Sequence, residues 1–268
     1  MSFVKPTNNT IWITGASSGI GRALALYYAS TGARLVLSSR NLEGLREVEQ
    51  QCKPYTADVL VLPLDLEKNS DYSGEVDQVV TAFGTIDLLI LNGGISQRSK
   101  SLETPAAVER RLMEINYFGT VALAKAVLPV MIRQQRGHLV VVSSIVGKFG
   151  WPLRSSYSAA KHALHGYFET LRAEHHHDKI VVTMILPGRV QTNISFHSLK
   201  ADGTSHGKMD DGQAGGISAE NCARQIAKAI NKKKKEKLIG GTEILMARIR
   251  RWLPALYYKL VNKQTQRT

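Results

Sequence analysis

The chain has 268 residues, 43% of them hydrophobic and 21% charged, and this balance excludes a disordered protein because enough apolar surface is present to form a core. The formal net charge of +13 is concentrated at one end: residues 222–268 carry 13 Lys and Arg against two Asp and Glu. The other 221 residues are close to neutral at +2, so the charge predicts a basic tail and not a basic catalytic surface.

The two cysteines, Cys52 and Cys222, lie far apart and in no metal-ligand spacing, which argues against a disulfide framework and favours a reducing compartment. Met1–Asn9 is polar and lacks the apolar core of a secretory signal. No uninterrupted apolar run reaches the roughly 20 residues that span a bilayer. We therefore expect a cytoplasmic protein, and the basic tail leaves peripheral attachment to a membrane open.

Short apolar runs alternate with longer helix-like segments along the chain. The expected strands are Thr10–Thr14, Arg34–Ser38, Val59–Pro63, Ile86–Leu91, His138–Ser143, Val181–Leu186 and, more weakly, Lys237–Ile239. The expected helices are Ile20–Gly32, Leu42–Gln51, Glu75–Phe83, Pro105–Gln135, Tyr157–His177 and Ala219–Asn231. This alternation predicts one α/β domain over residues 1–268, with a doubly wound parallel sheet of about seven strands and helices on both faces.

A glycine-rich turn, T-G-A-S-S-G-I-G, joins the first expected strand to the first expected helix. Gly15, Gly19 and Gly21 permit a tight turn and let backbone N–H groups approach a pyrophosphate at a helix N-terminus. An ordinary strand–turn–helix corner is the alternative interpretation.

The second expected strand ends in L-S-S-R, where sheets of this type often place a carboxylate against the adenosine ribose. Here the position holds Ser39, followed by Arg40. A hydroxyl and a cation suit a 2′-phosphate, so we expect NADP in preference to NAD. Alternatively, Arg40 is a solvated residue at the start of a helix.

Tyr157 and Lys161, in Y-S-A-A-K, are four residues apart and lie on one face of the expected helix. A phenol and an ammonium titrate near ~10 in water, so neither alone is a good acid or base at neutral pH. Placed together, the ammonium stabilises the phenolate and lowers the tyrosine pKa toward the working range. The alternative is a Tyr–Lys pair on the surface.

The chemical motifs follow one another in a specific order along the chain. T-G-A-S-S-G-I-G is followed by Asn92-Gly93-Gly94, Asn116, Ser144, Y-S-A-A-K and Pro187-Gly188. Over about residues 8–240 this joint pattern resembles the short-chain dehydrogenase/reductase family. The resemblance implies a Rossmann-type fold, in agreement with the alternation of strands and helices, and an oxidoreductase with a nicotinamide cofactor.

The resemblance implies four catalytic residues. Tyr157 is expected to be the general acid/base that protonates a carbonyl oxygen as hydride arrives, and Lys161 to hold the nicotinamide ribose and tune Tyr157. Ser144 is expected to hydrogen-bond the substrate oxygen, whereas strand alternation points Ser143 the other way. Asn116 is expected to hold a water in the proton relay near Lys161.

The resemblance also implies a set of cofactor-binding residues. Asp65 would contact the adenine, Asn92 and Gly93 would line the adenosine side, and the segment P-G-R-V-Q-T would meet the nicotinamide. The expected set is Gly15, Ser17, Ser18, Gly19, Ile20, Gly21, Ser39, Arg40, Asp65, Leu66, Asn92, Gly93, Gly94, Tyr157, Lys161, Pro187, Gly188, Val190 and Thr192. One departure is L-N-G-G at residues 91–94, where the family usually has N-N-A-G; it affects strand packing more than chemistry.

Two segments bear on the substrate. Residues 193–216 form the longest expected coil, which in the family commonly is a substrate lid, and a disordered insertion is the alternative. In residues 241–268 an apolar stripe of Leu245, Ile249, Trp252, Leu253, Leu256 and Leu260 lies among basic residues, and Pro254 would kink it or start a second helix. This amphipathic extension fits an anionic membrane surface, an acidic carrier protein, the core of the protein itself or a partner subunit.

Together these features predict an NADP(H)-dependent enzyme that interconverts a carbonyl and an alcohol on an apolar substrate. The segment K-L-I-G-G-T-E-I-L-M differs from the ending typical of acyl-carrier-protein reductases and favours a branch similar to hydroxysteroid, retinoid or other lipid dehydrogenases. A 3-oxoacyl-carrier-protein reductase remains an alternative. Alternatives of another class are a non-catalytic nucleotide-sensing scaffold and a membrane-surface or carrier-docking module.

Metal and nucleic-acid functions are not expected. The consecutive residues His175, His176 and His177 cannot all point to one centre, so they predict a solvated helix end. The Lys232–Lys237 run lacks accompanying readout groups for nucleic acid. The two longest helices resemble those that form four-helix dimer interfaces in the family, which predicts a homodimer or homotetramer.

Overall fold

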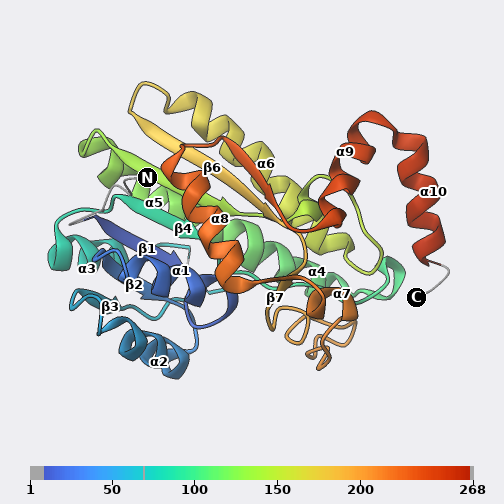
Figure 1. The fold of residues 1–268 in the computed structure, drawn as a ribbon, viewed down its shortest axis with the longest axis horizontal. Helices are drawn as coiled ribbons and strands as arrows, with labels where there is room; N and C mark the ends of the chain where they lie inside the picture. Colours follow the sequence, from blue (N-terminus) through green and yellow to red (C-terminus); the bar gives the residue numbers. More distant parts are fainter. Residues whose placement is uncertain (1–8, 69, 266–268) are drawn as a thin grey trace.

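In the computed structural model, which describes residues 9–68 and 70–265, seven strands form one parallel sheet in the order β3-β2-β1-β4-β5-β6-β9 (Figure 1). The expected α/β fold with about seven strands is therefore confirmed. Met1–Asn9, expected to lack a signal, falls almost wholly outside the described residues. The strands are β1 (Thr10–Thr14), β2 (Arg34–Ser38), β3 (Val59–Val61), β4 (Leu88–Leu91), β5 (Gly137–Val142), β6 (Ile180–Pro187) and β9 (Glu236–Ile239).

The strand order reverses at β1, which pairs with β2 on one side and with β4 on the other. Connections leave these two neighbours in opposite directions, so a crevice opens beyond the carboxyl ends of β1 and β4. Every motif identified in the sequence lies at a carboxyl end or in the segment that follows one. The topology therefore assigns the site to this edge of the sheet.

Helices cover both faces of the sheet (Figure 1). One layer packs α1 and α8 on the sheet, with α2 beside α1, and the other layer contains α3, α4, α5 and α6. Their bounds are α1 (Gly19–Ala29), α2 (Leu42–Cys52), α3 (Ser73–Phe83), α4 (Ala106–Met113), α5 (Gly119–Arg133), α6 (Ser155–Glu174) and α8 (Ala219–Asn231).

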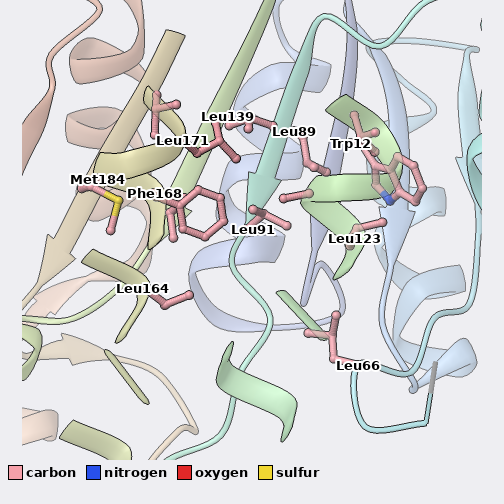
Figure 2. Packing of buried hydrophobic residues seen from close by; sticks show 14 of the residues in the cluster. Trp12, Leu66, Leu89, Leu91, Leu123, Leu139, Leu164, Phe168, Leu171 and Met184 are labelled. Carbon is pink, nitrogen blue, oxygen red and sulfur yellow. The ribbon is translucent and has the colours of Figure 1, made fainter. Parts of the chain in front are cut away.

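The alternation of side chains along each strand supplies both layers with apolar residues. Trp12, Leu89 and Leu139 join the cluster under α5 and α6, where Leu123 and Phe168 meet them (Figure 2). Their strand neighbours, such as Ile13, Ile90 and Val140, belong to the opposite cluster under α1 and α8. Both faces of the central strands are consequently buried, which explains why these strands are almost continuous apolar runs.

The helix expected at Pro105–Gln135 runs from Ala106 to Arg133 and contains a π-helical turn at Glu114–Phe118. It is the one helix among the described residues that is long and apolar enough to cross a membrane, and 61% of its most apolar window is buried in the protein. Leu112, Leu123 and Val127 lie in the hydrophobic core. Packing against the sheet therefore accounts for its apolar composition.

The segment 193–216 lies over the carboxyl edge of the sheet and is mostly irregular. It contains the short helix α7 (Asp211–Ala214), and it lies between β7 (Val190–Gln191) and β8 (Ile217–Ser218), which pair with each other. Ser195, Ser198 and Leu199 are buried against the rest of the protein. The segment is packed in this structure, and its role as a substrate lid stays a prediction.

The C-terminal extension forms two helices, α9 (Leu245–Trp252) and α10 (Pro254–Thr265), so Pro254 starts a second helix and does not merely kink one. Tyr257 is buried, and its hydroxyl donates a hydrogen bond to the Gly150 carbonyl. The expected apolar stripe is divided: Ile249 packs on the core, whereas the other five members are exposed: Leu245, Trp252, Leu253, Leu256 and Leu260. Exposed members lie on both sides of Pro254, in α9 and in α10. The membrane, carrier and subunit interpretations of this surface stay predictions.

Candidate active site

The glycine-rich turn between β1 and α1 makes a close contact across its own ends. Gly15 has a φ of +65°, a left-handed conformation that side chains rarely adopt. A Cβ atom on Gly21 would lie 2.1 Å from the Gly15 carbonyl oxygen, so only glycine lets α1 begin this close to the turn. This contact places the first N–H groups of α1 at the carboxyl edge of the sheet, where a phosphate could accept hydrogen bonds from them. The segment that carries them holds Ser17, Ser18, Gly19 and Ile20.

A hydrogen-bonded link joins the carboxyl ends of β1 and β4. The Thr14 hydroxyl accepts hydrogen bonds from the backbone N–H groups of Asn92 and Gly93, both at 2.9 Å. The Asn92 side-chain amide donates to the Thr14 carbonyl at 3.0 Å. Asn92 and Gly93 therefore hold the crevice together, and Thr14 is a residue that sequence reasoning missed although it opens the glycine motif.

The residues expected at the adenosine end follow β2 and β3. The Arg40 guanidinium is about half exposed and lies 3.4 Å from the Glu67 carboxylate, while the Ser39 hydroxyl accepts from the Asn41 N–H at 3.1 Å. The Asp65 carboxylate accepts from the Glu67 N–H at 3.0 Å. Leu66 is buried, and a Cβ on Gly93 would lie 2.8 Å from its Cδ1 atom. Glu67 was not expected here, and it gives Arg40 a counter-charge.

The expected catalytic residues converge on one cavity of about 550 Å³ at the carboxyl edge of the sheet. Ser144 follows β5, and its hydroxyl donates to the Pro187 carbonyl at 3.4 Å. Ser143 differs, because its hydroxyl donates to the Lys161 backbone carbonyl at 3.1 Å and is engaged in holding α6. Tyr157 lies in the first turn of α6, and its ring centroid is 5.7 Å from the Lys161 Nζ atom. The two residues therefore face the cavity together, as their spacing predicts.

Asn116 reaches the cavity from the π-helical turn between α4 and α5. Its amide nitrogen donates to the carbonyls of Ile95 and Leu112, and its oxygen accepts from the Ile95 N–H at 3.2 Å. A Cβ on Gly94 would lie 2.6 Å from the Asn116 oxygen and 3.5 Å from the Lys161 Nζ atom. Gly94 thus leaves the space in which these polar groups approach each other, and π-turns of this kind recur at functional sites.

Burial changes the ionisation of both members of the Tyr–Lys pair. The Lys161 ammonium donates to the Val142 carbonyl at 3.1 Å, and its burial lowers its pKa to about 8. Burial raises the pKa of the Tyr157 phenol, and a hydrogen bond with Ser144 and the positive charges of Arg98 and Arg154 oppose that rise. In the protein without ligands, Tyr157 is accordingly a neutral proton donor at neutral pH.

The segment that follows β6 lies beside the catalytic residues. Pro187, Gly188, Val190 and Thr192 line the same cavity, and a Cβ on Gly19 would lie 3.0 Å from the Thr192 Cγ2 atom. This contact places the nicotinamide-end motif next to the glycine-rich turn. A Cβ on Gly188 would lie 2.3 Å from a carboxylate oxygen of Glu243, which also accepts from the Arg189 N–H. Sequence reasoning missed Glu243 because it lies at the start of the C-terminal extension.

A buried glutamine positions the helix that carries Tyr157. The Gln97 side-chain oxygen accepts hydrogen bonds from the backbone N–H groups of Ser156 at 2.9 Å and Tyr157 at 3.2 Å. The N-terminus of α6 has no hydrogen bond from its own preceding side chain, so Gln97 satisfies donors that the helix leaves free. No sequence signal points to Gln97, since it comes from the loop after β4.

Not every expected residue borders the cavity. Its lining includes Ile20, Asn92, Gly94, Asn116, Ser144, Tyr157, Lys161, Pro187, Gly188, Val190 and Thr192. The remaining expected residues lie outside the cavity: Gly15, Ser17, Ser18, Gly19, Gly21, Ser39, Arg40, Asp65, Leu66 and Gly93. A nucleotide cofactor fits this arrangement, because the glycine cradle admits a phosphate and the Tyr–Lys pair lies at the other end of the same edge.

A cluster of possible metal ligands lies outside the cavity. The ligand atoms of His165, Glu169 and Glu236 are within 4.8 Å of one another, a grouping the sequence did not predict. The Lys148 ammonium lies 2.7 Å from the Glu236 carboxylate. Burial and this ammonium lower the pKa of His165 to about 4. The lysine therefore supplies the positive charge that a cation would bring.

Comparison with known proteins identifies the family of the chain. Residues 9–202 match the family described as short chain dehydrogenase. The bovine (Bos taurus) protein named dehydrogenase/reductase SDR family member 7B is 40% identical over 267 residues, which cover 97% of this chain and 82% of that protein. A short-chain dehydrogenase/reductase from Burkholderia phymatum, solved with NAD, matches with a TM-score of 0.83 at 22% identity over 95% of this chain and 96% of that one.

A second solved structure, an alcohol dehydrogenase from Thermococcus sibiricus complexed with 5-hydroxy-NADP, matches with a TM-score of 0.75 at 24% identity. It covers 87% of this chain and 97% of that chain. Fold, site and similarity together define an oxidoreductase of the nicotinamide-dependent class. The chain belongs to the short-chain dehydrogenase/reductase family, as its motifs predict. Within that family it is similar along nearly its whole length to the member 7B proteins of vertebrates.

Replacement of Gln97 by Leu is expected to weaken both the fold and the placement of Tyr157. Two N–H groups at the start of α6 lose their acceptor, which costs about 2–3 kcal/mol of the free energy of unfolding. Displacement of Tyr157 lowers kcat for carbonyl reduction about tenfold, with less than about a threefold change in the KM of the cofactor. Urea unfolding and steady-state kinetics measure the two effects.

Gln134→Leu is the matched control, because the Gln134 side chain accepts from the Ile86 N–H at 2.9 Å before β4, at the opposite edge of the sheet. It should lower stability and leave kcat within about twofold. Equal losses of kcat in the two variants would contradict a positioning role for Gln97.

Replacement of Lys161 by Met is expected to stabilise the protein at pH 7. The ordinary pKa of 10.5 falls to about 8 on folding, so folding disfavours the charged form. Between these pH values the unfolded chain binds more protons than the folded one, and the stability of the unmodified protein rises with pH. The free energy of unfolding of the variant should therefore exceed that of the unmodified protein by up to roughly 3 kcal/mol at pH 7. This difference should disappear between pH 8 and 10.5.

Urea titrations at pH 7, 9 and 10.5 measure the gap, and Lys125→Met, at an exposed position of α5, is the control. A Lys161→Met variant whose stability parallels the control at every pH would show that the buried ammonium is not destabilising.

Proposed function

We propose that the protein is an NADP(H)-dependent enzyme that interconverts a carbonyl and a primary or secondary alcohol on an apolar substrate. The observation that carries the proposal is the convergence of Asn116, Ser144, Tyr157 and Lys161 on one cavity that also has an apolar wall. Membership of the family supports the oxidoreductase class, and the roles proposed below rest on these four side chains.

In the reductive direction, the hydroxyls of Tyr157 and Ser144 hold the substrate oxygen, and Tyr157 gives its proton to that oxygen. The nicotinamide, when bound, supplies the hydride. The Lys161 ammonium stabilises the phenolate that remains, because its Nζ atom lies over the Tyr157 ring, 5.7 Å from the ring centroid. Asn116 and Lys161 border the same space, so they form the route by which a water returns the proton.

The walls of the cavity support an apolar substrate. Phe149, Trp151, Leu153, Met209 and Met246 line it, and they come from the loop after β5, the segment 193–216 and α9. Aromatic and thioether side chains make broad contacts with aliphatic or ring systems. Residues of the proposed lid and of the C-terminal extension thus enclose the substrate together with the loop after β5.

The residues after β2 support the preference for NADP(H). Ser39 stands where NAD-binding members of this fold class commonly have a carboxylate, and Arg40 follows it. The Arg40 guanidinium is half exposed, so its ion pair with Glu67 costs little to rearrange. An added 2′-phosphate carries two negative charges at most and forms charge-assisted hydrogen bonds with a guanidinium. Ser39 offers a further hydroxyl at the same turn.

Tyr157→Phe tests the proton-transfer role. The substitution keeps the ring and removes the hydroxyl, so kcat for NADPH-linked reduction should fall about 10²–10⁴-fold. The substrates are long-chain ketones, aldehydes, steroid ketones and a 3-oxoacyl thioester of a carrier protein. Tyr167→Phe, ten residues further along α6, should retain kcat within about twofold. Unchanged turnover in Tyr157→Phe would contradict the mechanism, and thioester turnover alone would favour the acyl-carrier alternative.

Arg40→Asp tests the cofactor preference. Loss of the cation and repulsion of the phosphate should lower kcat/KM for NADPH about 100-fold and change that for NADH less than about threefold. The control is Arg46→Asp, whose guanidinium is exposed and pairs with Glu49 within α2. A protein that uses NADH better than NADPH before any substitution would contradict the preference.

A further inference from the structure

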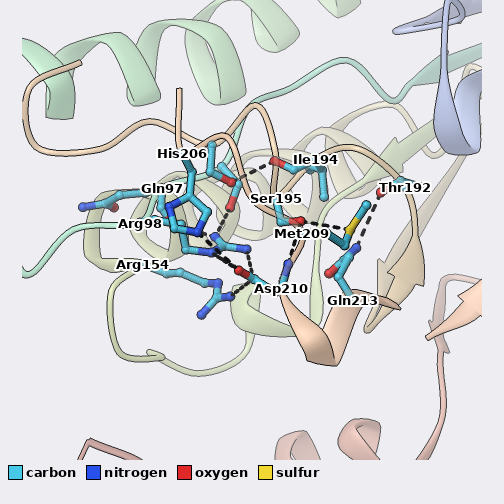
Figure 3. Close-up of polar contacts among 12 residues, drawn as sticks. Gln97, Arg98, Arg154, Thr192, Ile194, Ser195, His206, Met209, Asp210 and Gln213 are labelled. Atoms are coloured by element: carbon cyan, nitrogen blue, oxygen red, sulfur yellow. Dashed lines mark hydrogen bonds and ion pairs between the residues drawn. The ribbon is translucent and has the colours of Figure 1, made fainter. Parts of the chain in front are cut away.

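Two arginines, Arg98 and Arg154, line the same cavity as Tyr157, and the proposed reaction gives them no role. Arg98 comes from the loop after β4, and Arg154 directly precedes α6. Their side chains are only 6% and 21% exposed. Both point at Asp210, which belongs to the segment 193–216 (Figure 3). Burial of a guanidinium group costs free energy unless acceptors take its hydrogen bonds. An N–H group of these arginines without an acceptor in the protein would therefore indicate a ligand that accepts from it.

All three guanidinium nitrogens of Arg98 donate hydrogen bonds within the protein. Its Nε and Nη2 atoms donate to the Asp210 carboxylate at 2.9 and 2.5 Å, and its Nη1 atom donates to the Ser96 hydroxyl and the Gln97 carbonyl. Arg154 is different: Nη2 donates to the same Asp210 oxygen at 3.0 Å and Nη1 to the Pro152 carbonyl at 3.3 Å. Within residues 9–68 and 70–265, these are the hydrogen bonds that its guanidinium makes, so donor capacity remains on the cavity side.

The charges around this wall do not cancel. Two guanidinium groups share one carboxylate oxygen, and Arg189 and Lys208 also line the cavity. Burial, with repulsion from Arg98 and Arg189, lowers the pKa of Arg154 to about 10, although Asp210 opposes the change. Two further carboxylates line the cavity, Asp211 and Glu243, and Glu243 already accepts from the Arg189 and Gly241 N–H groups. Among the described residues that line the cavity, the four cations Arg98, Arg154, Arg189 and Lys208 still outnumber the three carboxylates. A further anion would therefore be stabilised beside Arg154.

We propose that Arg154, held against Asp210 together with Arg98, forms a subsite for an anionic group, a carboxylate or a phosphate, at one end of an otherwise apolar substrate. The subsite deepens the proposed function and rests on it, because the anion and the reacting carbonyl would belong to one molecule. Arg98 orients the Asp210 carboxylate, and Arg154 donates to both that carboxylate and the ligand. The apolar residues Trp151, Leu153 and Met209 border the same wall and take the aliphatic part.

The ion pairs of Asp210 with Arg98 and Arg154 hold segment 193–216 against the rest of the protein. Asp210 balances only part of the charge of the two arginines, so an anionic ligand beside Arg154 would lie where the segment meets the core (Figure 3). A purely structural latch would need the same ion pairs and would not distinguish an anionic ligand from a neutral one. The two interpretations therefore differ in ligand binding.

The first experiment measures binding without turnover. Isothermal titration calorimetry with dodecanoate, dodecyl phosphate and 1-dodecanol compares the unmodified protein with Arg154→Gln, Arg154→Lys and Arg136→Gln. Arg136 is a control because it is exposed and pairs with Asp87 near the amino ends of β4 and β5. We expect at least one anion to bind tenfold or more tightly than the alcohol, and the tighter anion identifies the group. Arg154→Gln should remove this difference, Arg154→Lys should retain part of it, and Arg136→Gln should retain all of it.

The second experiment measures turnover of 11-oxododecanoate and its methyl ester with NADPH. The ratio of kcat/KM for acid to ester should be tenfold or more if the carboxylate is the group, and should fall to about one in Arg154→Gln. Equal binding of anions and alcohol by the unmodified protein overturns the subsite, and so does an anion preference that survives in Arg154→Gln. Anion binding lost in Arg154→Gln, with no reduction of any carbonyl by the unmodified protein, upholds the subsite and refutes the proposed reaction.

Discussion

The hydrogen bond from the Lys161 ammonium to the Val142 carbonyl is the interaction on which the site depends. It fastens α6 to the carboxyl end of β5, so Tyr157, one helical turn earlier, is held over the same edge. Ser143 strengthens the attachment by donating to the Lys161 carbonyl, which leaves the adjacent Ser144 hydroxyl for the cavity. The burial that makes this attachment rigid also lowers the pKa of the lysine, so the protein accepts a less stable fold in exchange for a cation beside the phenol.

A second constraint comes from the reversal of strand order at β1. It opens the crevice that the glycine-rich turn borders, and the Thr14–Asn92 hydrogen bonds keep β1 and β4 together at its base. The loop after β4 then supplies residues to both parts of the site: Gly94 leaves room for Asn116, and Gln97 caps α6. One loop thus contacts both the end of the crevice beside Thr14 and the start of α6, and its side chains Ser96, Gln97 and Ser99 are buried although they belong to no regular element.

The fold and much of the site follow from local sequence patterns. Parallel strands buried on both faces are nearly continuous apolar runs, and the glycines of the turn are required by backbone geometry, so both are visible in the chain. Tyr157 and Lys161 are visible because helical spacing alone puts them on one face. Arg98, Arg154 and Asp210 were not found in this way. Each is an ordinary polar residue in its local sequence, and only their burial around a shared carboxylate marks them.

The sequence by itself determined the alternation of strands and helices, the glycine-rich turn and the placement of Tyr157 and Lys161 on one face of a helix. These features depend on backbone conformation and on neighbours within one or two turns. The tertiary structure decided the π-turn that directs Asn116, the pairing of Arg40 with Glu67, the cap that Gln97 provides and the packing of Ile249 on the core while the rest of the C-terminal stripe is exposed. Those outcomes depend on contacts between segments tens of residues apart, whose energies arise from burial and pairing and so leave no periodic signal along the chain.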